Sequence, residues 1–286
     1  MTNTQVTTAG STPDVPLNHV ANSLARGVHP LSVVAAGAVV PASCSIGPFC
    51  TVGAHVVLGE GCTLVSHVVL DGHLTLGEGV LVHPFTALGI SPQDLKYNGE
   101  PTRCEIGAGT VIRESVTISR GTVGGGGITR VGRECLIMAY THIGHDSQIG
   151  DGVILANGAT LAGHVTVEDY AVVGALNPVH QHCTIGRYAY IGGGTTITQD
   201  VLPYSLTSVR RENRAFGLNK IGLERRGFTP AEVKQLREAY RLLQISHLNT
   251  TQALEAIRAK VASGEFGERV AYLAEFIAKS ERGVIK

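Results

Sequence analysis

The chain has 286 residues and a formal net charge of zero, because 23 Lys and Arg balance 23 Asp and Glu. This balance excludes a general binder of nucleic acid or other polyanions, which would carry a basic excess. Gly is abundant (36 residues), aromatic residues make up only 5%, and hydrophobic residues make up 43%. This composition excludes disorder for most of the chain and favours closely spaced backbone around a core of small and aliphatic side chains.

The N-terminal region is polar and Thr-rich, and residues 1–24 are predicted to form a flexible extension. It contains no apolar run of the length that a signal peptide or a membrane span requires. We therefore expect a cytoplasmic protein without a membrane span.

The central region is a sequence repeat. Val, Ile or Leu recurs at every sixth residue, a small side chain usually follows four residues later, and Gly often follows directly. The aliphatic series is Val28, Val34, Val40, Ile46, Val52, Leu58, Leu64, Leu70, Leu76, Val82, Leu88, Ile106, Ile112, Ile118, Val131, Ile137, Ile143, Ile149, Leu155, Leu161, Val167, Val173, Val179, Ile185, Ile191 and Ile197. A fixed period of six is typical of a parallel β-helix, in which each hexad forms one short strand and a turn. The fold class is therefore predicted as mainly β, with the β-helix over residues 25–204.

The repeat is interrupted twice, and it ends before the C-terminus. Residues 89–105 and 120–130 are predicted to leave the β-helix as loops, and insertions in repeat proteins commonly build the binding face. Residues 205–286 are predicted to form a helical domain that caps the strands. Thr229 and Glu232 have the spacing of a capping box, with Pro230 at the first helical position, and further helices are expected at about 250–262 and 267–281.

The six cysteines are predicted to be buried packing residues. Five of them occupy the small inward position of the hexad, and a disulfide framework is not expected without a secretory signal. No CxxC spacing supports a metal site at these cysteines. Asn177 also falls on an inward position, where its polar side chain breaks the pattern.

Ten histidines lie in the repeat, and none occupies an inward position. The earlier five are interpreted as ordinary surface residues: His29, His55, His67, His73 and His83. The later five gather with an aspartate, because residues 18 apart occupy equivalent places on successive coils. Asp146, His164 and His182 are therefore predicted to form one column, with His145 beside it and His142 and His180 nearby. Such a cluster suits a general base oriented by a carboxylate, and it could instead bind zinc.

Four segments resemble the acyl-carrier-protein–UDP-N-acetylglucosamine O-acyltransferases that begin lipid A synthesis. The segments are PQDLKYNGEPTR (92–103), IRESVTISRGTVGGGGITRVG (112–132), AYTHIGHDSQIG (139–150) and GLNKIGLERRGF (217–228). The resemblance covers about residues 28–286. It implies a left-handed β-helix, a homotrimer with active sites between neighbouring subunits, and transfer of a 3-hydroxyacyl chain from acyl carrier protein to the 3-hydroxyl of UDP-N-acetylglucosamine without a cofactor or metal.

The resemblance also implies roles for individual residues. His145 would be the general base, Asp146 would orient it, and the Gly163 N–H would stabilise the oxyanion. Gly193 would limit the length of the acyl chain, and a Gly there leaves room for a long one. The other residues implied in substrate binding are Asp94, Lys96, His142, His164, His180, Gln181, Asn219, Arg225 and Arg226.

Three features depart from the family pattern. Ser119 stands where the family often has His, Ile221 replaces an acidic residue, and segment 205–215 does not align cleanly. Because Ser119 replaces that His, an alternative reaction is N-acylation of a UDP-3-amino sugar. A zinc-dependent hydratase resembling the hexapeptide carbonic anhydrases is a further alternative. Acyl carrier protein is acidic, so a basic docking patch is expected, and its candidates are Arg225, Arg226, Arg237 and Arg241.

Overall fold

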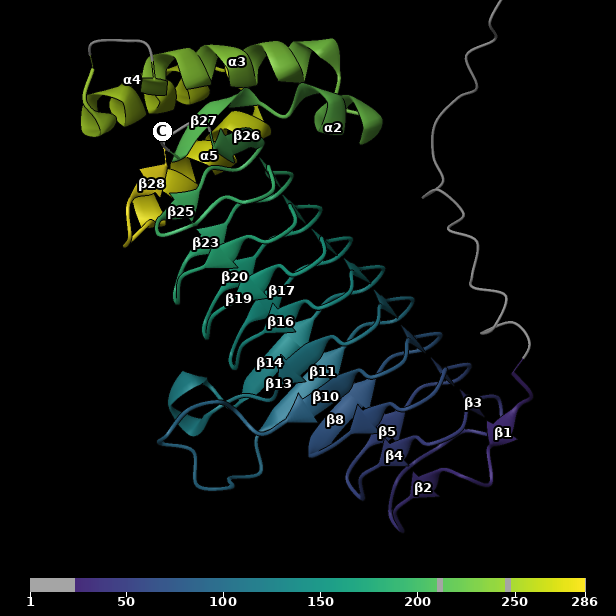
Figure 1. Ribbon diagram of the computed structural model, residues 1–286. Helices are drawn as coiled ribbons and strands as arrows, with labels where there is room; N and C mark the ends of the chain where they lie inside the picture. Colours follow the sequence, from purple (N-terminus) through teal and green to yellow (C-terminus); the bar gives the residue numbers. More distant parts are fainter. Residues whose placement is uncertain (1–23, 210–212, 245–247, 286) are drawn as a thin grey trace, which may run out of the picture.

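The computed structural model describes residues 24–209, 213–244 and 248–285. It shows a long prism of short parallel strands that ends in a group of helices at the C-terminal end (Figure 1). The extension expected at residues 1–24 lies almost wholly outside the described residues. No helix among the described residues is long and apolar enough to cross a membrane.

Each face of the prism is one sheet, and from β1 to β26 consecutive strands fall on different sheets. The 11-stranded sheet, called sheet A, contains β1 (Gly27–Val28), β3 (Ser45–Ile46), β6 (Thr63–Leu64), β9 (Leu81–Val82), β12 (Val111–Ile112), β15 (Leu136–Ile137), β18 (Ile154–Leu155), β21 (Val172–Val173), β24 (Tyr190–Ile191), β26 (Ser205–Val209) and β27 (Asn213–Leu218). The 8-stranded sheet B contains β2 (Val33–Val34), β4 (Thr51–Val52), β7 (Val69–Leu70), β10 (Ala87–Ile90), β13 (Thr117–Ser119), β16 (His142–Ile143), β19 (Thr160–Leu161) and β22 (Pro178–Val179). The 9-stranded sheet C contains β5 (Val57–Leu58), β8 (His73–Leu76), β11 (Arg103–Ile106), β14 (Ile128–Val131), β17 (Gln148–Ile149), β20 (Thr166–Val167), β23 (Thr184–Ile185), β25 (Asp200–Val201) and β28 (Val284–Ile285).

The six-residue repeat produces this architecture directly. From β1 to β24 and outside the insertions, paired residues are 18 positions apart, as in the pairing of Ile154 with Val172, so three hexads make one coil. The aliphatic positions point inward and are buried from Ile46 onward. The first of the series, Val28, remains 46% exposed because it lies in the first coil that the described residues form.

Small inward side chains fill the rest of the prism core. All six cysteines are buried and their thiols are free, as predicted. The structure also explains the inward Asn177. Its side-chain amide donates to the Gly192 carbonyl (3.0 Å), and its oxygen accepts from the Thr195 backbone N–H (2.6 Å). Asn177 therefore satisfies backbone groups of the next coil, which makes its burial tolerable.

The prism has three edges, and they differ in chemistry. The apolar edge, between sheets A and B, carries Phe49, Phe85, Tyr140 and Leu176, each 53–71% exposed. The tyrosine edge, between sheets C and A, carries the stacked rings of Tyr170, Tyr188 and Tyr204. The histidine edge, between sheets B and C, carries Asp146, His164 and His182, all with φ near +60°. Both insertions leave the prism at the histidine edge, between β10 and β11 and between β13 and β14 (Figure 1).

The C-terminal region begins with strands. β26 pairs with β24 in parallel and with β27 in antiparallel fashion, so residues 205–209 and 213–218 extend sheet A before the first helix. The helices are α2 (Lys220–Arg225), α3 (Pro230–Gln244), α4 (Thr250–Ala262) and α5 (Glu268–Lys279). The predicted capping box is confirmed: the Glu232 carboxylate accepts from the Thr229 N–H (2.7 Å), and the Thr229 hydroxyl accepts from the Glu232 N–H (3.2 Å).

One interpretation of the histidines is wrong. His83 is 3% exposed and is not an ordinary surface residue. Its Nδ1 lies 3.2 Å from a Glu114 carboxylate oxygen, and burial lowers the pKa of the imidazole more than Glu114 raises it. His83 occupies neither inward position of the hexad, but it is buried beside Glu114, and the charge of Arg113 also acts on it.

Candidate active site

The site on the histidine edge is built around Asp146. The turn between β16 and β17 holds this residue at φ +60°, and its side chain is completely buried. Its Oδ1 accepts from the Thr122 backbone N–H (2.8 Å), and its Oδ2 accepts from the Thr122 hydroxyl (2.6 Å). Its own N–H donates to the Thr129 hydroxyl (2.8 Å). Hydrogen bonds of this kind compensate the cost of burying a charged carboxylate.

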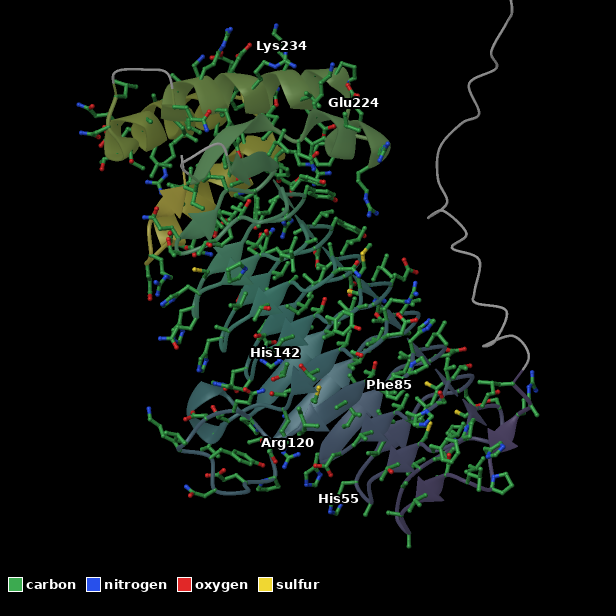
Figure 2. The ribbon with its side chains drawn as sticks, viewed as in Figure 1. His55, Phe85, Arg120, His142, Glu224 and Lys234 are labelled. Carbon is green, nitrogen blue, oxygen red and sulfur yellow. The ribbon has the colours of Figure 1, made fainter. Side chains whose placement is uncertain are left out.

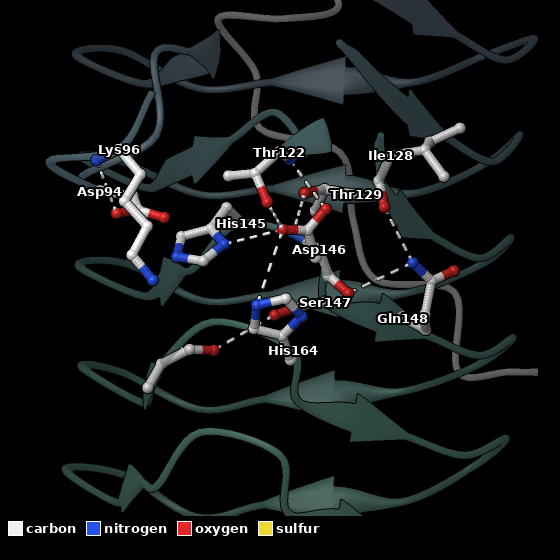
Figure 3. Close-up of polar contacts among 11 residues, drawn as sticks. Asp94, Lys96, Thr122, Ile128, Thr129, His145, Asp146, Ser147, Gln148 and His164 are labelled. Carbon is white, nitrogen blue, oxygen red and sulfur yellow. Dashed lines mark hydrogen bonds and ion pairs between the residues drawn. The ribbon is translucent and has the colours of Figure 1, made fainter. Parts of the chain in front are cut away.

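His145 is bonded to this carboxylate. Its Nδ1 lies 2.8 Å from Asp146 Oδ2 (Figure 3), and its side chain is 17% exposed. A carboxylate only accepts hydrogen bonds, so Nδ1 carries the proton and the Nε2 lone pair is left available. Carboxylate, imidazole and available Nε2 together form the arrangement of an oriented general base.

Two glycines let the backbone approach this pair closely. A Cβ at Gly163 would lie 2.6 Å from His145 Cε1 and 2.7 Å from Nε2, so only Gly fits beside the ring. A Cβ at Gly125 would lie 2.1 Å from Asp146 Cγ. Gly125 ends the short 3-10 turn Val123–Gly125, so part of the Gly run 124–127 covers the aspartate.

The predicted column is confirmed. The His164 ring meets the His145 ring edge-on at 5.1 Å and stacks on the His182 ring at 4.5 Å between centroids. His164 Nε2 also lies 3.9 Å from Asp146 Oδ2. Burial lowers the pKa of His164 more than Asp146 raises it, so the ring favours its neutral form.

His142 lies on β16, beside the column. Its Nδ1 is 2.8 Å from the Thr117 hydroxyl, on the neighbouring strand β13. Burial is the main cause that lowers the pKa of His142, and the charge of His145 adds to it. His142 is therefore a neutral polar group on the wall of the site near pH 7.

The first insertion brings Asp94 and Lys96 to the same side (Figure 3). Asp94 Oδ1 accepts from the Lys96 N–H (3.0 Å) and closes a small turn, and Asp94 is also among the charges that act on His164. Lys96 is exposed. One carboxylate and one ammonium thus stand opposite the His145–Asp146 pair.

Two of the remaining predicted residues, Asn219 and Arg226, contact the tyrosine edge, whereas His180 and Gln181 directly precede His182 at the histidine edge. Asn219 caps α2 by accepting from the Gly222 N–H (3.2 Å), and its amide donates to the Tyr188 carbonyl (3.1 Å). The Arg226 guanidinium lies 4.4 Å above the Tyr170 ring. Asn219 and Arg226 therefore lie at the tyrosine edge, and the exposed Arg225, which is the last residue of α2, directly precedes Arg226. Of the others, His180 contacts the Gln181 carbonyl (3.1 Å), and His180, Gln181 and Gly193 are exposed.

Sequence reasoning missed the residues that hold the site together. Thr122, Thr129 and Thr117 bind Asp146 and His142, yet they are 24, 17 and 25 positions from the groups that they contact. Thr122 and Thr129 lie in the second predicted insertion, residues 120–130, where no periodic pattern marks them. Ser119 is buried, and its hydroxyl has no hydrogen-bond partner among the described residues.

The ligand atoms of His145, Asp146 and His164 lie within 4.8 Å of one another, so the donor set could reach a metal ion. The Asp146 oxygen that faces them already accepts from Thr122 and His145. These bonds describe an oriented imidazole, and they do not favour the zinc alternative.

Known proteins resemble this chain in sequence and in fold. Residues 200–285 match the family model described as UDP-N-acetylglucosamine O-acyltransferase, domain 2, and residues 128–163 match the bacterial transferase hexapeptide model. The acyl-[acyl-carrier-protein]–UDP-N-acetylglucosamine O-acyltransferase of Alkalilimnicola ehrlichii is 46% identical over 71% of this chain and 77% of its own length. The enzyme of that name from Anaeromyxobacter dehalogenans is 44% identical over 91% of this chain and 99% of its own.

The chain belongs to the acyl-[acyl-carrier-protein]–UDP-N-acetylglucosamine O-acyltransferase family. The solved structure of the Francisella novicida UDP-N-acetylglucosamine acyltransferase has a TM-score of 0.87 and 36% identity, over 91% of this chain and 94% of that one. The prism is the left-handed β-helix of this family, and the protein is an acyltransferase. The relatives are named for oxygen transfer, which does not favour the amino-sugar or zinc alternatives.

Proposed function

We propose that the protein transfers a (R)-3-hydroxyacyl chain from acyl carrier protein to the 3-hydroxyl of UDP-N-acetylglucosamine, the first step of lipid A biosynthesis. The observation that carries this proposal is the 2.8 Å contact between His145 Nδ1 and the buried Asp146 carboxylate. It leaves Nε2 to act as a base on a hydroxyl, which needs activation before it attacks a thioester.

The proposed chemistry needs no cofactor. Nε2 of His145 takes the proton of the sugar 3-hydroxyl while that oxygen forms a bond to the thioester carbonyl carbon. The Gly163 N–H stabilises the oxyanion that develops. The intermediate then collapses, the carbon–sulfur bond breaks, and the imidazolium returns the proton to the thiolate of the carrier protein. Asp146 stabilises the imidazolium throughout.

The working unit is proposed to be a homotrimer with its sites between subunits. In one chain Arg226 stacks at the tyrosine edge, while His145 lies at the histidine edge. A nucleotide held by Asn219, Arg225 and Arg226 could reach His145 only if a second copy supplied one of the two groups. The apolar edge supports association, because exposed rows of large apolar side chains mark interaction surfaces.

The remaining assignments concern the two substrates. Asp94, Lys96, His142, His164, His180 and Gln181 are proposed to contact the sugar, the phosphates or the acyl chain. Gly193 is exposed and has no side chain, so we propose that it leaves room for a long acyl chain. The exposed Arg225, Arg226, Arg237 and Arg241 are proposed to dock the acidic carrier protein. A cytoplasmic location follows from these substrates.

The direct test offers the purified protein 3-hydroxyacyl carrier protein with UDP-N-acetylglucosamine or with its 3-amino analogue. We expect the oxygen acceptor to react, and exclusive use of the amino sugar would contradict the proposal. His145→Ala should remove nearly all turnover without changing the molar mass measured by light scattering. Undiminished turnover in that variant would exclude His145 as the base.

A further inference from the structure

Arg120 lies where the two insertions leave the prism, and the mechanism above assigns it no task. It follows β13 and opens the second insertion, and its side chain is only 12% exposed (Figure 2). Its backbone N–H donates to the Ile90 carbonyl (3.0 Å), at the end of β10, where the first insertion begins. Arg120 is therefore attached to both insertions at their bases.

The guanidinium makes four contacts, and three of them reach the first insertion or its base. Nε donates to the Tyr97 hydroxyl (2.8 Å), Nη1 to the Gly89 carbonyl (2.7 Å), and Nη2 to the Ser91 hydroxyl (3.1 Å). Nη1 also pairs with the Asp71 carboxylate (3.3 Å), which lies two coils earlier, after β7. A planar group with five N–H donors can fix several acceptors at once in one geometry, which Lys cannot do.

Tyr97 connects the Arg120 guanidinium to the turn of the first insertion that carries Asp94 and Lys96. Its hydroxyl accepts from Arg120 and donates to the Glu100 carbonyl (2.7 Å), and the guanidinium also lies 5.4 Å from the centre of the ring. The Tyr97 N–H donates to the Asp94 carbonyl (3.0 Å). One tyrosine thus joins Arg120 to both ends of the turn that presents Asp94 and Lys96.

The backbone around Arg120 is shaped to admit the guanidinium. A Cβ at Gly72 would lie 2.5 Å from Arg120 Nη1, and one at Gly89 would lie 2.3 Å from the Asp71 carbonyl oxygen. Both glycines also have positive φ, at +62° and +68°. Any larger residue at Gly72 would occupy the space that Arg120 uses.

We propose that Arg120 is a positioning residue for the sugar-nucleotide substrate: it holds the first insertion in the conformation that presents Asp94 and Lys96 to the site. The inference rests on the proposed function, because that function supplies the ligand of Asp94 and Lys96. Arg120 acts through Tyr97 and does not touch the reacting atoms. Its loss should therefore weaken binding of the nucleotide sugar more than it slows the chemical step.

The test compares Arg120→Met and Arg120→Lys with the matched control Arg103→Met. Arg103 starts β11 at the other end of the insertion, is 59% exposed, and pairs only weakly with Glu105 at 4.0 Å. We expect Arg120→Met to raise KM for UDP-N-acetylglucosamine about tenfold, with kcat within about threefold, as for the loss of charge-assisted hydrogen bonds. Arg120→Lys should recover little, and Arg103→Met should resemble the wild type.

A readout independent of activity is hydrogen exchange of residues 91–102 in the intact protein. We expect exchange there to accelerate in Arg120→Met and, less strongly, in Tyr97→Phe, which keeps the ring and removes only the relaying hydroxyl. The two substitutions should be non-additive in KM, because they break the same path. Tyr97→Phe lies on the insertion, so it tests the path even if Arg120→Met fails to fold.

The outcomes separate this inference from the proposed function. If the wild type does not acylate UDP-N-acetylglucosamine, the proposed function fails. The exchange experiment still shows whether Arg120 and Tyr97 hold the first insertion. If the wild type is active and KM and exchange are unchanged in Arg120→Met and Tyr97→Phe, the inference is wrong. A fall in kcat alone, at constant KM, would also overturn it.

Discussion

Gly163 lies so close to His145 that a methyl group added at Gly163 would overlap the imidazole, at 2.6 Å from Cε1 and 2.7 Å from Nε2. The coil that carries Gly163 therefore sets the position of the ring from one side, and Asp146 sets it from the other at 2.8 Å. The orientation of the proposed base depends on a residue that has no side chain.

Gly163→Ala is expected to turn the imidazole away from Asp146. A misplacement of about 1 Å at a reacting group can cost on the order of 10²-fold in rate, so we expect kcat to fall by about that factor. Steady-state kinetics and a thermal unfolding curve check this together. Wild-type kcat in a correctly assembled Gly163→Ala protein would mean that the ring position is not critical.

Gly125→Ala is expected to damage the site through Asp146. Its new Cβ would meet Asp146 Cγ at 2.1 Å, whereas a Cβ at the adjacent Gly124 would meet nothing within 4 Å. Displacing the turn removes the hydrogen bonds that Thr122 donates to the buried carboxylate, so we expect kcat to fall at least about tenfold. Gly124→Ala is the matched control and should stay close to the wild type. Equal losses in both variants would contradict the steric explanation.

His182 is expected to act by packing against His164. The rings stack at 4.5 Å with 13° between their planes. His182→Phe keeps an aromatic ring in the stack and should leave KM nearly unchanged. His182→Ala leaves His164 without that support and should raise KM several-fold, in line with about 1 kcal/mol for an aromatic pair. If His182→Phe is as impaired as His182→Ala, the imidazole itself is required.

The buried His83 is expected to make stability depend on pH. Burial lowers its pKa, so below about pH 6.5 the unfolded chain binds a proton that the folded protein does not. The free energy of unfolding therefore falls as pH decreases through that range, and the contribution of His83 is fully retained above it. The Tm difference between the wild type and His83→Gln should shrink from pH 7.5 to pH 5.5. A difference that grows on acidification would show that the Glu114 carboxylate outweighs burial.

The segments that resemble the family predict the His145–Asp146 pair but not its surroundings. The GHDSQIG segment placed His145 next to Asp146, and the structure gives the pair its hydrogen bond. The segment does not show why the aspartate is buried. The buried carboxylate accepts a hydrogen bond from the Thr122 hydroxyl, which belongs to a different loop. A bond between side chains that are 24 residues apart leaves no periodic signal in the sequence.

By itself the sequence determined the β-helix and the column of Asp146, His164 and His182. One coil takes three hexads, so a spacing of 18 is also a spatial neighbourhood. Tertiary structure decided what periodicity does not encode: the burial of His83, the strands at 205–209 and 213–218, and the attachment of the first insertion through Arg120. It also placed Arg226 and His145 on different edges of the prism. The repeat sets the direction in which each side chain points, whereas loops and neighbouring coils determine what that side chain meets.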